Sequence, residues 1–441
     1  MVLTKPDTGW SWVVMTATFC ILTIHGFLVY GSGMVQIALF ERFHDSVAKT
    51  SLAGSLLTGF LSCSGILDGV LIRRYSCRQV AVSGGILMVI GIFLSAFMTS
   101  LSWIIFTFGV VAGFGAGIQY TSMYITIGYN FKRNINLALG FALSGCGIGT
   151  FVFTPVFAYI MTVYSLEGIF ICLAGLSLQS IVFSVMIFPS SLEMKHKSNS
   201  TNTRKGTNSQ DTTSFCVNMI KLFKTRSFVV LLISLYIANF GTYIVYIHLA
   251  NYTTHKGSTE MEAALLLSII GLCSCVSRIL AGLACNSEVI EEPTLLFGTL
   301  GVTGVFTVLL PLYSHTLAGQ IVFAVAFGLY AGCLYSIMNG ITLRFLSLSD
   351  LGSAVGIELA VIGVGIMTGP PAVGYIMDST GNYDIGIVIA GLCIIAGAIL
   401  TLIAELCNNK KKKRDETKCD GEFTISLTED VLEKLKEECE Q

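Results

Sequence analysis

The sequence predicts an all-α membrane protein with twelve transmembrane helices in two six-helix bundles, and three observations support this fold class. Hydrophobic residues make up 53% of the 441 positions and charged residues only 12%, which is far from the balance of a soluble globule. Apolar runs of roughly 20 residues, the length a helix needs to cross ~30 Å of hydrocarbon, recur along nearly the whole chain. A polar stretch in the middle separates six runs from six more.

Each predicted span is a continuous apolar stretch, whereas a β-barrel would show alternating segments of ~10 residues. The first span lacks a small-residue cleavage site and is followed by further spans, so we do not expect a removable signal peptide. In chain order the spans are Ser11–Met34, Ser51–Leu71, Val80–Met98, Trp103–Ile127, Ile135–Met161, Gly168–Phe188, Phe228–Leu249, Ala263–Leu283, Thr294–Tyr313, Leu317–Leu343, Leu351–Met377 and Ile385–Ala404.

Lysine and arginine predict the orientation, because short loops rich in them stay in the cytoplasm. The loops on the side opposite the termini hold only three cations, Arg42, Lys49 and Lys256, so this side is predicted to be external. Both termini are therefore predicted to be cytoplasmic, with Trp10 and Trp12 holding the first span at the inner headgroups. The cations on the predicted cytoplasmic side include Lys5, Arg73, Arg74, Arg78, Lys132, Arg133, Lys195, Lys197, Arg204, Lys205, Lys221, Lys224, Arg226, Arg344, Lys410 and Arg414.

The polar stretches predict the domain organisation. The central stretch is rich in Ser, Thr, Asn and Lys and cannot bury enough apolar surface to fold alone, so we expect a disordered linker. The tail begins with KKKKR, a positive-inside anchor, and contains a short segment that could form an amphipathic helix and dock an accessory protein. Solvated disorder of this segment is the simpler expectation. The expected parts are a cytoplasmic N-terminus (1–10), an N-terminal bundle (11–188), a cytoplasmic linker (189–227), a C-terminal bundle (228–407) and a cytoplasmic tail (408–441).

Ionisable side chains inside the predicted spans are the first candidates for function, because an unpaired charge is costly in hydrocarbon. These residues are His25, Asp68, His248, Arg278 and Glu358. The planar guanidinium of Arg278 can bind a carboxylate through two parallel hydrogen bonds. Facing an aqueous cavity, it would anchor an organic anion. The alternative is a snorkelling or salt-bridged arginine that only pins its helix.

The other four residues allow more than one interpretation. Glu358 could take up and release a proton as the site opens to each side, or could pair with Arg278 or with basic loop residues. Asp68 is the second candidate for proton coupling, although pairing with the nearby Arg73 and Arg74 is the simpler expectation. His25 could titrate or donate to a ligand, or could be a hydrogen-bonded packing residue. His248 lies near the outer end of its predicted span, where a position at the membrane interface accounts for it without a function.

Other motifs narrow the class of protein. No nucleotide-binding loop, H-E-x-x-H or serine elbow is present, so the sequence predicts neither an enzyme nor a cofactor. Cys273 and Cys275 point to different faces of a helix, which makes a metal site improbable. Glycine-rich runs such as LGFALSGCGIG, from Leu139 to Gly149, allow helices to approach closely and to slide.

Four stretches of the sequence resemble the monocarboxylate transporters, a branch of the major facilitator superfamily. The opening PDTGWSWVV is similar to the D-G-G-W-G-W signature of that family, with Thr8 and Ser11 at two of its glycine positions and Gly9 kept. YNFKRNINLALGFALSG, from Tyr129 to Gly145, is similar to its second signature. RRYSCR after the second span and GPPAVGYIMDSTGNY at the end of the eleventh add two further matches. Together these stretches extend over nearly the whole transmembrane chain.

The resemblance implies the superfamily fold and a transport function. Proton-coupled lactate carriers of the family use a lysine at the end of span one and an aspartate–arginine pair in span eight. Arg278 matches the arginine, whereas Ser274 stands at the aspartate position and Tyr30 at the lysine position. This pattern implies a divergent member that carries a larger or aromatic carboxylate, an amino acid or another organic solute. Any proton site would then fall to Glu358 or His25.

The resulting hypothesis is a secondary transporter of the plasma membrane that rocks two bundles about a central site. Arg278 would hold the substrate carboxylate, with Tyr30, Ser274 and His25 as neighbours. The expected partners are a small organic anion, H+ if transport is coupled, the lipid bilayer and a single-span accessory protein, but no nucleic acid. The alternative is a transporter-like sensor or scaffold that signals through its tail, and deletion after Arg414 would separate the two. The lack of a charged ring disfavours a channel.

Overall fold

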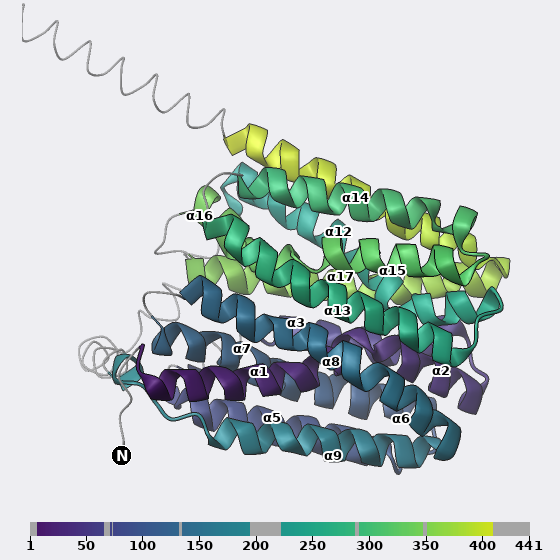
Figure 1. The fold of residues 1–441 in the computed structure, drawn as a ribbon, viewed down its shortest axis with the longest axis horizontal. Coiled ribbons are helices and arrows are strands. Elements are labelled where there is room, and N and C mark those ends of the chain that lie inside the picture. Colours follow the sequence, from purple (N-terminus) through teal and green to yellow (C-terminus); the bar gives the residue numbers. More distant parts are fainter. Residues whose placement is uncertain are drawn as a thin grey trace, which may run out of the picture.

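The fold is an assembly of long helices that run side by side, and this confirms the predicted all-α class. In a computed structural model of the chain, the structure describes residues 7–65, 71–72, 74–131, 135–194, 222–286, 291–346 and 351–408. In Figure 1 the helices of the N-terminal half lie together in the lower part and those of the C-terminal half in the upper part. The start of the first helix and the end of the last lie at the same end of the assembly.

The N-terminal half contains the first six predicted spans. The first span is split between two helices, and the fourth contains a π-helical segment, labelled η1. The helices are α1 (Gly9–Tyr30), α2 (Ser32–Phe43), α3 (Val47–Cys63), α5 (Cys77–Ser95), α6 (Leu101–Ile104), η1 (Ile105–Ala112), α7 (Gly113–Asn130), α8 (Ile135–Val163) and α9 (Leu166–Val185).

The C-terminal half contains the other six, and here the tenth span is split. Its helices are α12 (Arg226–His255), α13 (Glu260–Asn286), α14 (Glu292–Tyr313), α15 (Leu317–Ala331), α16 (Leu334–Phe345), α17 (Leu351–Thr380) and a last helix over Tyr383–Asn408. Among the described residues, eleven helical stretches are long and apolar enough to cross a membrane. The 17-residue α3 covers the first part of the remaining predicted span, so each of the twelve contains helix among the described residues.

The two split spans place tyrosines near the centre of the protein. α1 ends at Tyr30 and the chain passes through Gly31 before α2 begins. α15 ends at Ala331, and α16 begins at Leu334 and carries Tyr335 in its first turn. A Cβ atom on Gly332 would lie 2.5 Å from the Ser274 hydroxyl oxygen, so glycine at this break allows α13 to approach closely. Both breaks therefore lie beside the contact between the two halves.

Glycines also form the two seams along which the halves meet, α8 against α13 and α3 against α17. A Cβ atom on Gly271 of α13 would lie only 2.7 Å from the carbonyl oxygen of Gly147 on α8. On the second seam, a Cβ atom on Gly363 of α17 would lie 2.7 Å from the Gly59 carbonyl oxygen of α3. Because backbone meets backbone at these points, the two bundles form surfaces that can slide or rock against each other.

Candidate functional site

Arg278 lies on α13 at the contact between the two halves and is only 1% exposed. Its Nη1 donates to the Leu143 carbonyl oxygen of α8 at 2.9 Å, and its Nη2 donates to the Tyr30 hydroxyl at 2.7 Å. Its guanidinium carbon also lies 5.3 Å from the centre of the Tyr30 ring. Both hydrogen-bond partners belong to the opposite half of the protein and neither carries a charge.

None of the ion pairs found among the described residues includes Arg278. The side-chain Nε atom is buried and has no hydrogen-bond partner within the same part of the chain. A buried cation normally has a counter-charge, because its desolvation is otherwise expensive. The guanidinium thus keeps both its charge and one donor available for an anionic group.

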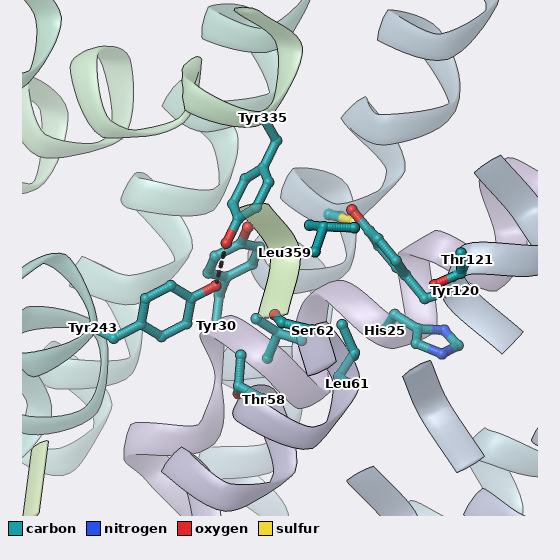
Figure 2. Close-up of a pocket in the computed structure, with 12 residues that line it drawn as sticks. His25, Tyr30, Thr58, Leu61, Ser62, Tyr120, Thr121, Tyr243, Tyr335 and Leu359 are labelled. Carbon is teal, nitrogen blue, oxygen red and sulfur yellow. Dashed lines mark hydrogen bonds between the residues drawn. The ribbon is translucent and has the colours of Figure 1, made fainter. Parts of the chain in front are cut away.

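Tyrosines surround this arginine on the side of the C-terminal half. The Tyr30 ring lies 4.7 Å from the Tyr246 ring and 6.5 Å from the Tyr243 ring, measured between centroids. The Tyr243 and Tyr335 hydroxyl oxygens lie 3.2 Å apart, and Figure 2 shows these two groups pointing toward one another. The cluster therefore offers both ring faces and hydroxyl groups next to a buried positive charge.

A cavity lies beside this cluster, between the two halves (Figure 2). Its volume is about 20 Å3, and one water molecule needs roughly 10–15 Å3. Only water fits, so an organic solute requires the halves to move apart. The lining residues come from α1, α3, α7 and α8 of one half and α12, α16 and α17 of the other: His25, Val29, Tyr30, Thr58, Leu61, Ser62, Tyr120, Thr121, Cys146, Tyr243, Tyr335 and Leu359.

His25 lines the same cavity but its two ring nitrogens face the protein backbone. Nδ1 lies 2.9 Å from the Ile21 carbonyl oxygen, and Nε2 lies 3.1 Å from the Ala116 carbonyl oxygen. Because both neighbours are acceptors, a neutral imidazole satisfies only one of these contacts, whereas an imidazolium donates to both. His25 thus combines the position of a ligand neighbour with the hydrogen bonds of a packing residue.

Glu358 of α17 is completely buried and its partner is Thr342 of α16, not Arg278. The Thr342 hydroxyl oxygen lies 2.8 and 2.9 Å from the two carboxyl oxygens of Glu358, and 2.8 Å from the Met338 carbonyl oxygen. A hydroxyl has a single proton, so a protonated Glu358 that donates to Thr342 fits this arrangement. The next residue along α17, Leu359, lines the cavity, whereas Glu358 does not.

The remaining sequence candidates lie farther from the cavity or outside the described residues. Ser274 is buried one turn before Arg278 on α13 and packs against Gly332 at the break between α15 and α16. It does not line the cavity. Asp68 lies outside the residues that the structure describes. Arg278 and Tyr30 thus meet at the contact between the halves, and Tyr30 and His25 line the cavity there, whereas Arg278 and Ser274 do not line it.

Sequence reasoning missed the tyrosines of the C-terminal half. Tyr243 and Tyr246 are three residues apart and so share one helix face, a spacing that could have indicated a common site. Their neighbour His248 is fully buried, with Nε2 2.9 Å from the Pro370 carbonyl oxygen and Nδ1 3.4 Å from the amide nitrogen of Gln36. These buried contacts, one of which reaches the opposite half, occupy both ring nitrogens of His248.

Comparison with known proteins supports the resemblance inferred from the sequence motifs. The family model described as Major Facilitator Superfamily matches residues 16–287 and 287–435. Monocarboxylate transporter 2 of Meriones unguiculatus is 28% identical, covering 94% of this chain and 88% of its own. Monocarboxylate transporter 13 of Bos taurus is 26% identical over 91% of each chain. Monocarboxylate transporter 10 of Danio rerio is 27% identical, over 96% of this chain and 83% of its own.

The fold also resembles a solved transporter. The crystal structure of the peptide transporter POT, a mutant in complex with sulfate, superposes with a TM-score of 0.69 over 92% of this chain and 97% of that chain. The sequences are 13% identical, so this likeness concerns the fold alone. The chain belongs to the Major Facilitator Superfamily, as a divergent relative of its monocarboxylate transporters.

Proposed function

We propose that the protein is a secondary transporter that moves a small monocarboxylate or a related organic solute across the plasma membrane by alternating access. The observation that carries this proposal is the buried Arg278, which bridges the two halves through neutral partners only. A substrate carboxylate would replace the Tyr30 hydroxyl and use the unpartnered Nε. The guanidinium would then regain the counter-charge that its burial requires.

The water-sized cavity corresponds to a closed stage of the transport cycle. Separation of the halves along the α8–α13 and α3–α17 seams would enlarge the cavity toward one side of the membrane at a time. Tyr30, Tyr243 and Tyr335 would then line a site with Arg278 at its base, with His25 and Ser274 as neighbours. This is alternating access about a site midway between two bundles, as secondary transporters of this architecture use it.

The proposed proton-coupling groups are Glu358 and Asp68. The contact of the buried Glu358 carboxyl group with Thr342 supports a role in taking up a proton when the halves part. A single-span accessory protein is a further proposed partner. The alternative of a sensor or scaffold depends on the tail, which lies outside the described residues.

The test is an uptake screen of labelled monocarboxylates at two external pH values in cells that express the chain. Arg278→Ala should lower uptake at least about a hundredfold, because it removes two charge-assisted hydrogen bonds of about 1.5–3 kcal/mol each. Arg278→Lys keeps the charge but loses the fork, so it should rescue only part of the uptake. Arg42→Ala is the control, because Arg42 is an exposed arginine that does not line the cavity between the halves. Normal uptake by Arg278→Ala at equal surface expression would remove this residue from the mechanism.

A further inference from the structure

A second cavity, which we call the flank cavity, is lined by residues of the N-terminal half alone. Its volume is about 300 Å3, at the lower end of the range of ligand pockets, roughly 300–1,000 Å3. The end of α2, the turn after α5 and the first turns of α9 form its walls. In Figure 1 α5 and α9 form the lower edge of the assembly, so this flank faces away from the C-terminal half.

The flank cavity lies at the level where membrane hydrocarbon meets water. Both α5 and α9 are long and apolar enough to cross a membrane. The cavity begins at Ser95, the last residue of α5, and at Leu166, the first residue of α9. Trp103, a few residues after the cavity wall, is exposed, and an indole favours this boundary. A phospholipid places its headgroup at the same level, and the predicted orientation makes this the outer leaflet.

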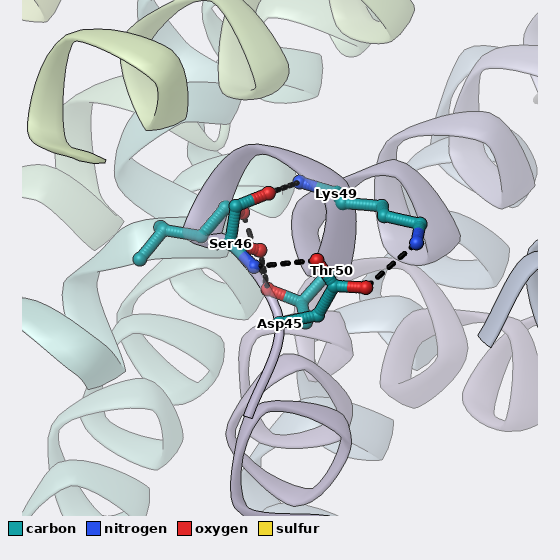
Figure 3. A network of polar contacts seen from close by, with 5 residues as sticks. Asp45, Ser46, Lys49 and Thr50 are labelled. Atoms are coloured by element: carbon teal, nitrogen blue, oxygen red, sulfur yellow. Dashed lines mark hydrogen bonds and ion pairs between the residues drawn. The ribbon is translucent and has the colours of Figure 1, made fainter. Parts of the chain in front are cut away.

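Two exposed side chains of opposite charge line the flank cavity, Arg42 from α2 and Glu167 from α9. Neither belongs to any of the ion pairs found in the part of the chain that the structure describes. By contrast, the neighbouring Lys49 donates to Asp45 at 2.6 Å, as Figure 3 shows. The flank cavity therefore offers one cation and one anion that have no counter-charge of their own.

Apolar side chains form much of the remaining wall and continue along the two helices. Phe43 and Phe97 line the cavity together with the two charges, and the face of an aromatic ring attracts a quaternary ammonium group. Beyond the cavity, exposed apolar residues recur at spacings of three, four and seven, so they share one face of each helix. They are Ile86, Ile90, Phe93 and Phe97 along α5 and the turn after it, and Ile171, Leu178, Val182 and Val185 along α9.

We infer that the flank cavity binds the phosphocholine headgroup of a phospholipid in the outer leaflet. The Arg42 guanidinium would bind the phosphate. The Glu167 carboxylate and the rings of Phe43 and Phe97 would hold the quaternary ammonium. The acyl chains would lie on the exposed apolar faces of α5 and α9. This inference goes beyond the proposed transport function, because the flank cavity shares no lining residue with the cavity between the halves.

The two charges favour a zwitterionic lipid over an anionic one. Phosphatidylcholine brings an anion for Arg42 and a cation for Glu167. Phosphatidylglycerol brings only the anion, so the Glu167 carboxylate would repel it. Since an exposed ion pair changes an affinity by up to about fivefold, phosphatidylcholine should bind about fivefold more tightly than phosphatidylglycerol.

The experiment is a lipid titration of the purified full-length protein in detergent, followed by native mass spectrometry. Phosphatidylcholine and phosphatidylglycerol with identical acyl chains are the two probes. Arg42→Ala should weaken the binding of phosphatidylcholine about fivefold, because the phosphate loses its partner. Glu167→Gln should abolish the preference for phosphatidylcholine over phosphatidylglycerol. Both side chains are exposed, so both variants should fold, and thermal unfolding checks this.

Two control variants carry the same kinds of change outside the flank cavity. Glu41→Gln alters an exposed acid next to Arg42 in the chain that does not line the cavity, and it should keep the lipid preference. Arg226→Ala alters an exposed arginine at the start of α12, and it should bind phosphatidylcholine as the unmodified chain does.

Several results would overturn the inference. One is equal affinity of the unmodified chain for the two lipids, and another is a lipid preference that survives in Glu167→Gln. Displacement of the lipid by an equal concentration of glycerophosphocholine, which lacks acyl chains, would indicate a site for a soluble zwitterion instead. A membrane protein that remains bound and excludes the lipid would indicate a protein-docking face. Because the readout is bound lipid, it is independent of whether the protein carries a monocarboxylate, which the Arg278 variants test.

Discussion

Replacing Gly271 by alanine would place a methyl group against the backbone of the opposite bundle. The new Cβ atom would lie 2.7 Å from the Gly147 carbonyl oxygen and 2.8 Å from the Phe151 backbone nitrogen. Neither atom can rotate away as a side chain would, so α8 and α13 would have to part by about 0.7 Å to restore ordinary contact. Overpacking of this kind costs about 1–3 kcal/mol, and the closed conformation should lose that amount of stability.

Gly301→Ala on α14 is the matched control, because a Cβ atom there would have no neighbour within 4 Å. In a helix, alanine is more favourable than glycine by roughly 0.5–1 kcal/mol. Thermal unfolding in detergent should therefore move in opposite directions, with Gly271→Ala unfolding earlier than the unmodified chain and Gly301→Ala at the same temperature or later. Uptake by Gly271→Ala should also fall, since the closed stage becomes less accessible. If Gly271→Ala proved as stable as Gly301→Ala, the seam would not be packed backbone to backbone.

Two further predictions concern contacts between the halves. Asp378→Asn removes the charge that assists two hydrogen bonds to the first turn of α3, and one of the two acceptor oxygens. A charge-assisted hydrogen bond is worth about 1.5–3 kcal/mol, so thermal unfolding in detergent should begin at a lower temperature; an unchanged unfolding temperature would exclude Asp378 as a latch between the halves. Tyr30→Phe removes the hydroxyl that is bonded to Arg278 but keeps the ring. The substrate carboxylate then no longer competes with this hydroxyl for the guanidinium, so KM for uptake should fall. A higher KM would mean that the hydroxyl itself binds substrate.

The helices were largely predictable from the chain because lipid allows few alternatives. A span must satisfy every backbone hydrogen bond internally, so apolar length alone indicates a helix. The prediction was less accurate at helix ends, as at α2, which continues to Phe43 instead of ending near Met34. Apolar length indicates only the segment that hydrocarbon can bury, and α2 carries the charged Glu41 and Arg42 in its exposed last turn.

The site was predictable in part. Arg278 was identifiable from the sequence because a guanidinium inside an apolar run is energetically costly wherever the helix lies. A charged side chain at such a position therefore indicates a function. The sequence did not indicate that its partners are Tyr30 and the Leu143 carbonyl, or that Glu358 contacts Thr342 instead.

The sequence by itself determined the all-α class, the apolar stretches long enough to cross a membrane, and which ionisable residues lie inside those stretches, because these properties depend on hydrophobic length and composition along one chain. Only the tertiary structure decided which of those residues meet. Hydrogen bonds and carboxyl contacts act over a few ångströms, and whether two side chains from different bundles come within that range depends on how the glycine seams bring the bundles together.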